Sequence, residues 1–266
     1  MNRLENVFAT CKTEKRAALV GYLTAGDPDL ATSETVLMKL AEQVDVLEIG
    51  MPFSDPMADG PVIQAASERA LASGTHISDV FALTAKIRAA HPQLGIVLMG
   101  YANTPYAMGF STFADKAAKA GADGVLLVDI PPEEADICAE TFRSHGLHQI
   151  FLLSPTSTEE RIKLVAGAAS GFIYYVSLTG ITGAEMGNVD KVRGQLEAIR
   201  RHTDLPICVG FGIKTAEQAT KVAAFADGVV IGSLFVSKVA ENAGNACAIA
   251  DSVSSSAIAM RQAVAA

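Results

Sequence analysis

Residues 206–233 read PICVGFGIKTAEQATKVAAFADGVVIGS and contain the unit that decides the fold. A short apolar run at 206–209 is followed by a helical segment at 215–224, which opens with Thr215, and then by a second apolar run at 228–231. Threonine is a frequent residue at helix starts. The apolar runs are continuous and do not alternate, as expected for strands that helices cover. The pattern predicts a strand, a helix and a second strand that pairs in parallel with the first.

The same unit recurs along the whole chain. Eight apolar runs predict strands at residues 18–22, 44–49, 95–99, 124–129, 149–153, 172–176, 206–209 and 228–231. Helices are predicted at residues 30–43, 78–90, 112–120, 132–144, 158–168, 189–202 and 215–224, and a last one begins near Leu234. Eight such units in about 250 residues predict an α/β fold, a (β/α)8 TIM barrel. A doubly wound open sheet is the alternative.

Three further segments fall outside the eight units. Residues 1–10 predict an extra N-terminal helix at the bottom of the barrel, and residues 62–72 an inserted helix after the second strand. Apolar residues recur at three- and four-residue steps in residues 246–266, which predicts a C-terminal helix that packs on the barrel. Because no linker divides the chain, we expect one domain over residues 1–266.

Composition limits the classes of function. Half of the 266 residues are hydrophobic and 19% are charged, which excludes a disordered protein. The formal net charge of −8 argues against binding to nucleic acid or to an anionic membrane surface. Four separated cysteines without a C-x-x-C pair indicate neither a disulfide scaffold nor a metal site. There is no signal peptide and no apolar run of about 18 residues, so we expect a cytoplasmic location.

The active site of such a barrel lies at the C-terminal ends of the strands. Glycines follow the last two predicted strands at Gly212 and Gly232, and Ser233 opens the final helix. Backbone N–H groups at glycines and at a helix N-terminus can hold a phosphate group. With Gly183 from the segment after the sixth strand, these residues predict a phosphate site. The alternative is that the glycines only make tight turns.

Two acidic residues are candidates for the chemistry. Glu48 lies in an otherwise apolar predicted strand, where a carboxylate either faces the site or is a costly buried charge. Desolvation there raises a carboxyl pKa and suits proton transfer near neutral pH. Asp59 follows in a proline-rich loop, from which it can face the same pocket. The alternatives are a Glu48 carboxylate tied to buried backbone or to a salt bridge, and a simple turn role for Asp59.

Two other loops have an informative composition. Residues 177–188 contain three glycines and two threonines, which is typical of a mobile lid, or alternatively of a flexible surface loop. The loops after the second and third strands combine prolines with large apolar side chains, which favours a protein interface, unless these side chains pack under their own loops. The apolar and proline residues are Met51, Pro52, Phe53, Pro56, Met57, Pro105, Tyr106 and Met108.

Residues 47–61, LEIGMPFSDPMADGP, give the most specific signal. This segment resembles the tryptophan synthase α-subunit family, and the resemblance extends over essentially the whole chain. Further matching segments lie at residues 24–28, 101–103, 129–131, 180–183, 210–212 and 232–233.

The resemblance implies a carbon–carbon lyase that cleaves indole-3-glycerol phosphate to indole and glyceraldehyde 3-phosphate. Glu48 would be the acid and base, and Asp59 would accept the indole N–H and stabilise the positive charge of the intermediate. Tyr174 would orient the substrate, and Thr182 would close over Asp59. The implied indole contacts are Tyr22, Met99, Leu126 and Phe211, and the implied phosphate contacts are Gly183, Gly212, Gly232 and Ser233.

The resemblance also implies a partner. No metal and no organic cofactor is implied in this chain, whereas pyridoxal phosphate would belong to a β subunit. The two chains would form an α2β2 heterotetramer in which indole passes to the β subunit. Pro52, Asp55 and Pro56 would lie at the interface. One position departs from the family pattern, because Leu178 stands where many members have a basic residue. The resemblance therefore implies no lid-fastening role for the side chain at this position.

Two rival functions remain at the level of sequence. Another phosphate-binding barrel enzyme, such as a ribulose-phosphate epimerase or an indole-glycerol-phosphate synthase, would need histidine ligands or an inward lysine on the strands, and the predicted strands have neither in place. A non-catalytic regulatory subunit would be marked by loss of Glu48 or Asp59, and both are present.

Overall fold

The computed structural model describes residues 2–177, 189–210 and 212–265. All eight predicted strands form, pair in parallel with their neighbours in chain order and close into a barrel. The open doubly wound sheet is thereby excluded. The strands are β1 Ala18–Thr24, β2 Val46–Gly50, β3 Gly95–Gly100, β4 Gly124–Leu127, β5 His148–Leu153, β6 Ile173–Val176, β7 Ile207–Gly210 and β8 Gly228–Ile231.

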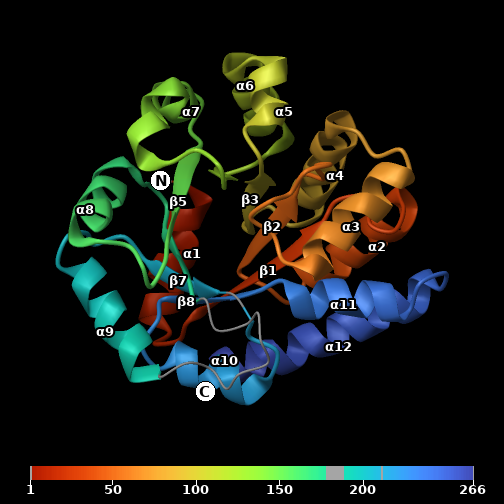
Figure 1. Cartoon of the computed structure of the whole chain (residues 1–266). Helices are drawn as coiled ribbons and strands as arrows, with labels where there is room; N and C mark the ends of the chain where they lie inside the picture. Colours follow the sequence, from red (N-terminus) through yellow and green to blue (C-terminus); the bar gives the residue numbers. More distant parts are fainter. Residues whose placement is uncertain (1, 178–188, 211, 266) are drawn as a thin grey trace.

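Helices surround this barrel (Figure 1). The expected N-terminal, inserted and C-terminal helices are present as α1, α3 and α12. The helices, with one 3-10 helix η1, are α1 Arg3–Thr13, α2 Leu30–Ala41, α3 Pro61–Ala72, α4 Ile77–Ala90, α5 Asn103–Met108, α6 Phe110–Ala120, η1 Pro132–Ile137, α7 Ala139–Ser144, α8 Glu159–Ala168, α9 Val189–Arg200, α10 Ala216–Ala223, α11 Ser233–Glu241 and α12 Ala246–Val264. None of the helices in the described part of the chain is long and apolar enough to cross a membrane.

Two elements differ from the sequence predictions. Helix α5 forms where a loop was expected, since Pro105 lies in its first turn, where backbone N–H groups have no intrahelical partner. Gly109 ends this helix with φ 84°. The single helix predicted at 132–144 divides at Cys138, whose backbone (φ −139°, ψ −14°) is not helical. No glycine or proline lies at that break, so the sequence pattern does not locate it.

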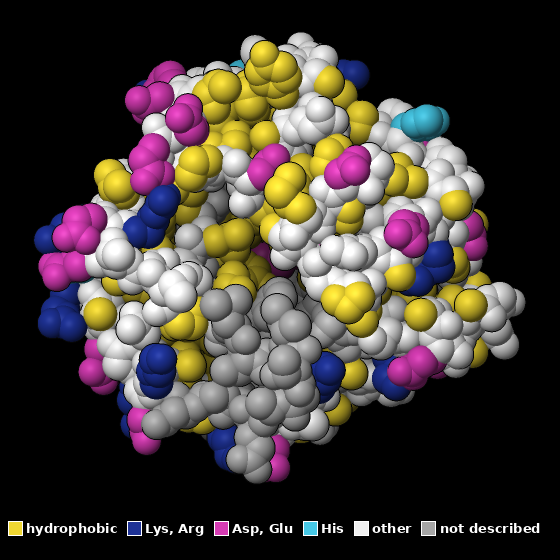
Figure 2. Space-filling model, viewed as in Figure 1, with side chains coloured by type: hydrophobic (Ala, Val, Ile, Leu, Met, Phe, Trp, Pro, Cys, Tyr) yellow, Lys and Arg dark blue, Asp and Glu magenta, His cyan; other side chains and the backbone are white. Residues whose placement is uncertain are grey.

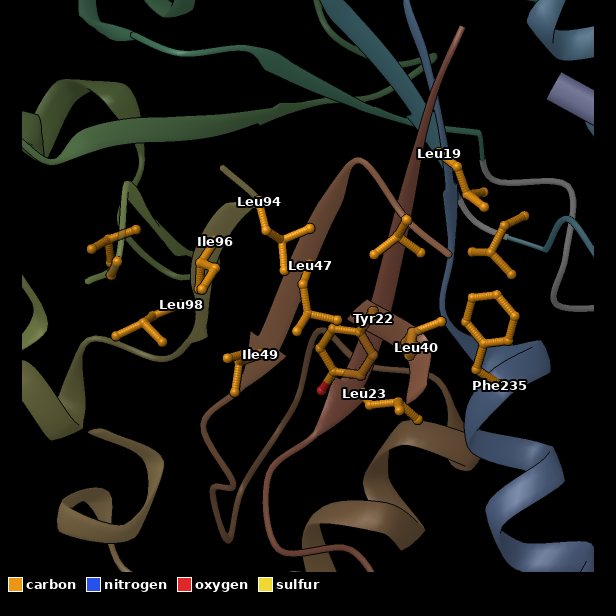
Figure 3. Packing of buried hydrophobic residues seen from close by; sticks show 14 of the residues in the cluster. Leu19, Tyr22, Leu23, Leu40, Leu47, Ile49, Leu94, Ile96, Leu98 and Phe235 are labelled. Atoms are coloured by element: carbon orange, nitrogen blue, oxygen red, sulfur yellow. The ribbon is translucent and has the colours of Figure 1, made fainter. Parts of the chain in front are cut away.

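The outer layer of the core packs the strands against the helices. Side chains of Leu19, Leu47 and Ile49 point away from the barrel axis and belong to one buried cluster with Leu40 of α2 and Phe235 of α11 (Figure 3). Because side chains alternate along a strand, the residues between them point inward.

The inner layer fills the barrel and is closed at one end by α1. Phe8 of α1 lies 5.6 Å from Phe172, measured between ring centroids. A Cβ at Gly95 or Gly124, the first residues of β3 and β4, would lie 2.8 or 3.3 Å from the side chain of Leu4. Helix α1 therefore covers the N-terminal ends of the strands, and the open end of the barrel is the C-terminal one.

Candidate active site

A cavity of about 400 Å³ lies at the C-terminal ends of the strands. Figure 2 shows a hollow near the centre of this face, with hydrophobic side chains on its walls. The structure brings together eight of the predicted site residues as lining: Tyr22, Glu48, Asp59, Met99, Tyr174, Gly212, Gly232 and Ser233.

Glu48 is the most buried ionisable group of the cavity. It lies on β2 between Tyr22 of β1 and Val97 of β3, and it shares the inward face of β2 with Val46. The residue is 1% exposed, and its Oε1 atom has no hydrogen-bond partner among the described residues. Burial raises the pKa of Glu48 to about 8. The carboxyl group can therefore donate a proton near neutral pH and take one back.

Two phenols flank this carboxyl group without competing for its proton. Tyr22 and Tyr174 line the same cavity, and burial raises the pKa of both above the ordinary tyrosine value. The Tyr22 hydroxyl lies 3.1 Å from Thr24 Oγ1. Both phenols therefore stay neutral, and Glu48 titrates alone in the neutral range among these three groups.

Asp59 is held by a tyrosine to which the sequence analysis gave no role. The Tyr101 hydroxyl donates to Asp59 Oδ2 at 3.0 Å and accepts from the backbone N–H of Ala58, also at 3.0 Å. Its ring stacks on Phe53, with 5.0 Å between ring centroids. Burial raises the pKa of Asp59, and the hydrogen bond from Tyr101 opposes that shift. The sequence signals for Tyr101 were its place directly after the third strand and its segment, residues 101–103, in the family resemblance; neither assigned it a contact with Asp59.

The segment after Asp59 is anchored by α3. Gly60 caps this helix and Pro61 is its first residue, as is common at helix starts. Gln64 Nε2 donates to the Asp59 carbonyl at 2.9 Å. Farther along, Arg69 makes a two-point ion pair with buried Asp27, at 2.7 and 2.8 Å. Asp59 is thus held from two sides, by Tyr101 directly after β3 and by Gln64 of α3.

The opposite side of the cavity is suited to an anion. Gly212 lines the cavity, and its backbone has φ 85°, a conformation that favours glycine. Helix α11 begins at Ser233 after Gly232, which makes no side-chain cap hydrogen bond. The first N–H groups of a helix have no intrahelical partners and carry partial positive charge. These residues have the geometry expected of a phosphate site.

A second cavity of about 330 Å³ adjoins the first and shares Asp59, Met99 and Tyr174 with it. Its remaining lining is mostly apolar and includes Leu127 and Phe151. The two cavities together offer an apolar space and an anion-binding side, and Asp59 lines both.

Several predicted residues are not placed in the lining. Leu126 is fully buried in the inner layer, in one cluster with Tyr174, and lines neither cavity. Thr182, Gly183 and Phe211 lie outside the described residues, as does the predicted lid from Leu178 to residue 188. Their roles stay predictions. The first lid residue, Ser177, is described and buried.

The predicted interface loops are only partly exposed. Met57 is 80% exposed and Tyr106 is 69% exposed. Asp55 is exposed, and Pro52 and Pro56 are half-buried. Met51 and Pro105 are buried, so the interpretation as an interface is wrong for these two residues. A Cβ at Gly100 would lie 2.8 Å from the Met51 side chain, so Met51 packs against the end of β3.

A family model described as tryptophan synthase alpha chain matches residues 8–265. The chain belongs to this family. A tryptophan synthase alpha chain from Geobacter sulfurreducens is 52% identical over 237 residues, which cover 89% of each chain. One from Neisseria meningitidis is 47% identical over 250 residues, covering 94% of this chain and 95% of the relative.

Solved structures give the same result. The crystal structure of tryptophan synthase subunit alpha from Legionella pneumophila superposes with a TM-score of 0.91 at 39% identity, covering 99% of this chain and 98% of that one. A Mycobacterium tuberculosis tryptophan synthase chain superposes with a TM-score of 0.91 at 33% identity, covering 100% and 99%. Membership of the alpha chain family decides against the rival barrel enzymes, the ribulose-phosphate epimerase and the indole-glycerol-phosphate synthase.

Proposed function

We propose that this chain cleaves indole-3-glycerol phosphate to indole and glyceraldehyde 3-phosphate. The observation that carries the proposal is the buried Oε1 of Glu48, which has no hydrogen-bond partner among the described residues and lies in one cavity with Asp59 and the N-terminus of α11. Family membership supports the same reaction.

The reaction begins with a proton transfer to carbon. Glu48, protonated near neutral pH because of its raised pKa, donates its proton to C3 of the indole ring. Asp59 accepts a hydrogen bond from the indole N–H and stabilises the positive charge that develops on the ring. Tyr174 orients the ring beside these groups.

The second step breaks the carbon–carbon bond. The Glu48 carboxylate takes the proton of the glycerol hydroxyl next to that bond, and a carbonyl group forms there. The electron pair of the broken bond returns to the ring and neutralises it. The products are indole and glyceraldehyde 3-phosphate, and Glu48 again carries a proton. A carboxyl pKa near the working pH suits both transfers.

The phosphate group anchors the substrate at the other side of the cavity. We assign this role to Gly212, Gly232 and Ser233, with Gly183 as a further predicted donor. We assign the apolar contacts of the indole ring to Tyr22 and Met99, and Leu126 and Phe211 stay predictions. Thr182 stays a predicted closing residue for Asp59.

A β subunit is the proposed partner. Tryptophan synthase structures from Mycobacterium tuberculosis are among the close structural relatives, and we propose an α2β2 assembly that receives indole directly. Exposed Met57 and Tyr106, with Pro52, Asp55 and Pro56, form the proposed docking surface. Pyridoxal phosphate is assigned to the β subunit, and every step above uses only side chains of this chain. A cytoplasmic location stays a prediction.

One assay tests the reaction. The purified chain is given indole-3-glycerol phosphate, and indole release is followed with and without added β subunit. We expect slow release by the chain alone and faster release with the partner. A purified, folded chain that releases no indole under either condition contradicts the proposal.

A further inference from the structure

The cavity offers little positive charge to an anionic substrate. Two carboxyl groups, Glu48 and Asp59, line it, and Glu48 is protonated near neutral pH. Among the described lining residues, Lys214 is the only cationic one. A phosphate ester adds about two negative charges near neutral pH. The position of Lys214 therefore bears directly on how that ester is held.

The backbone of Lys214 is fixed beside the anion-binding side. Lys214 lies two residues after Gly212, and Ile213 between them is 3% exposed. The Lys214 N–H donates to Gln218 Oε1 at 2.8 Å. Gln218 also completes the capping box of α10 with Thr215. The residue is therefore held at the start of α10, at the edge of the cavity that Ser233 and Ser237 also line.

The ammonium group of Lys214 differs from that of neighbouring lysines. Lys221 on α10 pairs with Glu217 at 2.6 Å, and Lys238 on α11 pairs with Glu241 at 2.6 Å. Within the described part of the chain, Lys214 makes no such ion pair, and its side chain is exposed. Its charge is therefore not neutralised by a described carboxylate.

We propose that Lys214 is a phosphate-binding residue that supplies the cationic charge of this site. The inference rests on the proposed function, because it takes the phosphate of that substrate as the ligand. Backbone N–H groups at Gly212, Gly232 and Ser233 give direction to the binding, and Lys214 adds a point charge that the neutral backbone lacks.

The size and form of the effect follow from its electrostatic origin. A unit charge near a dianion in a solvated setting changes binding about five- to tenfold at low salt. The factor shrinks at high ionic strength because salt screens exposed charges. The phosphate does not react, so its binding is the same in the ground state and the transition state, and the change appears in KM and not in kcat.

Three variants of the full chain separate this role from general effects of charge. Lys214→Gln removes the charge and Lys214→Arg keeps it. Lys221→Gln removes a charge that is already paired with Glu217. We expect the KM for indole-3-glycerol phosphate to rise about five- to tenfold in Lys214→Gln at low salt. We expect kcat within about twofold of wild type, and near-normal KM in Lys214→Arg and Lys221→Gln. A KM unchanged in Lys214→Gln, or raised equally in Lys221→Gln, contradicts the proposal.

Equilibrium binding keeps this test independent of turnover. Glycerol 3-phosphate is titrated into wild type and Lys214→Gln by calorimetry, which requires no cleavage. A dissociation constant that rises by the same factor supports the role of Lys214 even if no indole is released. Equal affinities of the two proteins for glycerol 3-phosphate overturn it even if wild-type cleavage is normal. If the wild-type chain shows no cleavage, the proposed function is contradicted. The role of Lys214 is then decided by the glycerol 3-phosphate affinities of wild type and Lys214→Gln.

Discussion

The two ends of the barrel differ in the partners that they give to buried carboxyl groups. At the closed end, Asp123 is 1% exposed and accepts from Arg3 at 2.9 Å and from Arg88 at 2.6 Å. It also accepts the backbone N–H of Ile96 at 2.9 Å. At the open end, Glu48 is equally buried, and its Oε1 has no partner in the described residues.

A second residue of the closed end shows the consequence for ionisation. Burial acts to raise the pKa of Asp45, but hydrogen bonds from Arg16 and Arg261 outweigh it and hold that pKa below its ordinary value. Burial acts on Glu48 without such opposition and raises its pKa to about 8. The closed end surrounds its buried carboxyl groups with arginines, whereas the open end leaves one without a described partner, as the proposed mechanism requires.

The strongest way to break this comparison is Glu48→Gln. The amide keeps the shape of the side chain but cannot exchange a proton, so we expect cleavage to fall by about 10²- to 10⁴-fold. Steady-state indole release measures this loss. Near-normal turnover of the purified variant would remove Glu48 from the mechanism.

The same variant has a stability control whose sign follows from the raised pKa. The unfolded chain loses the Glu48 proton near pH 4.5, and the folded chain keeps it until about pH 8. Folded wild type therefore loses stability as pH rises through that window. Glu48→Gln removes this term, so we expect its melting temperature at pH 8 to equal or exceed that of wild type.

Asp123→Asn tests the closed end. Removing one partner of a buried ion pair leaves Arg88 without its counter-charge, and we expect a loss of about 3 to 5 kcal/mol in the free energy of unfolding. Urea unfolding measures it, with indole release at 25 °C expected to stay near wild type. Asp115→Asn is the matched control, because its ion pair with Lys119 is exposed and is worth about 0.3 to 0.5 kcal/mol. Equal losses in both variants would contradict the assigned role of the closed end.

Tyr101→Phe sharpens the account of the open end. It removes the hydroxyl that donates to Asp59 and keeps the ring that stacks on Phe53. Without this hydrogen bond the pKa of Asp59 rises further, so the acid limb of kcat/KM moves to higher pH. We expect a loss of about tenfold at acidic pH, corresponding to one lost hydrogen bond to a charged group.

The control for this variant is Tyr106→Phe, whose exposed phenol makes no hydrogen bond with a described residue. A pH–rate series from mildly acidic to alkaline conditions compares the two. A uniform loss at every pH in Tyr101→Phe would show that the hydroxyl holds the loop and does not tune Asp59.

The smallest expected effect concerns the partner surface. Asp55 is exposed in the same loop as Asp59, and its carboxylate accepts from Ser54 at 2.6 Å. We expect Asp55→Ala to reduce activation by the β subunit severalfold more than it reduces the basal rate, because docking shifts the loop toward its competent state. Asp251→Ala on α12 is the control. Equal proportional losses in both rates would assign Asp55 to the chemistry.

The fold was predictable because its strands are continuous apolar runs. The bounds of β8 were predicted without error, and most other bounds differ by one or two residues. Helix α5 was missed because a six-residue segment that contains Pro105 carries no apolar periodicity. That the chain is one domain over residues 1–266 stays a prediction.

Site residues could be predicted where the residue type is unusual for its place in the sequence. Glu48 is a carboxyl group in an apolar strand, and the glycines after β7 and β8 lie where this fold binds phosphate. Tyr101 and Lys214 could not be found in this way, because a tyrosine or a lysine in a loop is ordinary. Only the closed barrel brings Tyr101 to Asp59 and places Lys214 and Ser233 on the lining of one cavity.

A direct titration of Glu48 tests the central claim, that burial without a hydrogen-bond partner in the described part of the chain keeps this carboxyl group protonated at neutral pH. The chain is labelled with ¹³C at the glutamate side-chain carboxyl, and its NMR spectra are followed from pH 3 to pH 10 in wild type and in Glu48→Gln. We predict one resonance that titrates at about pH 8 and is missing from the variant. If the resonance missing from the variant titrates below about pH 5, near the ordinary glutamate value, the account is contradicted.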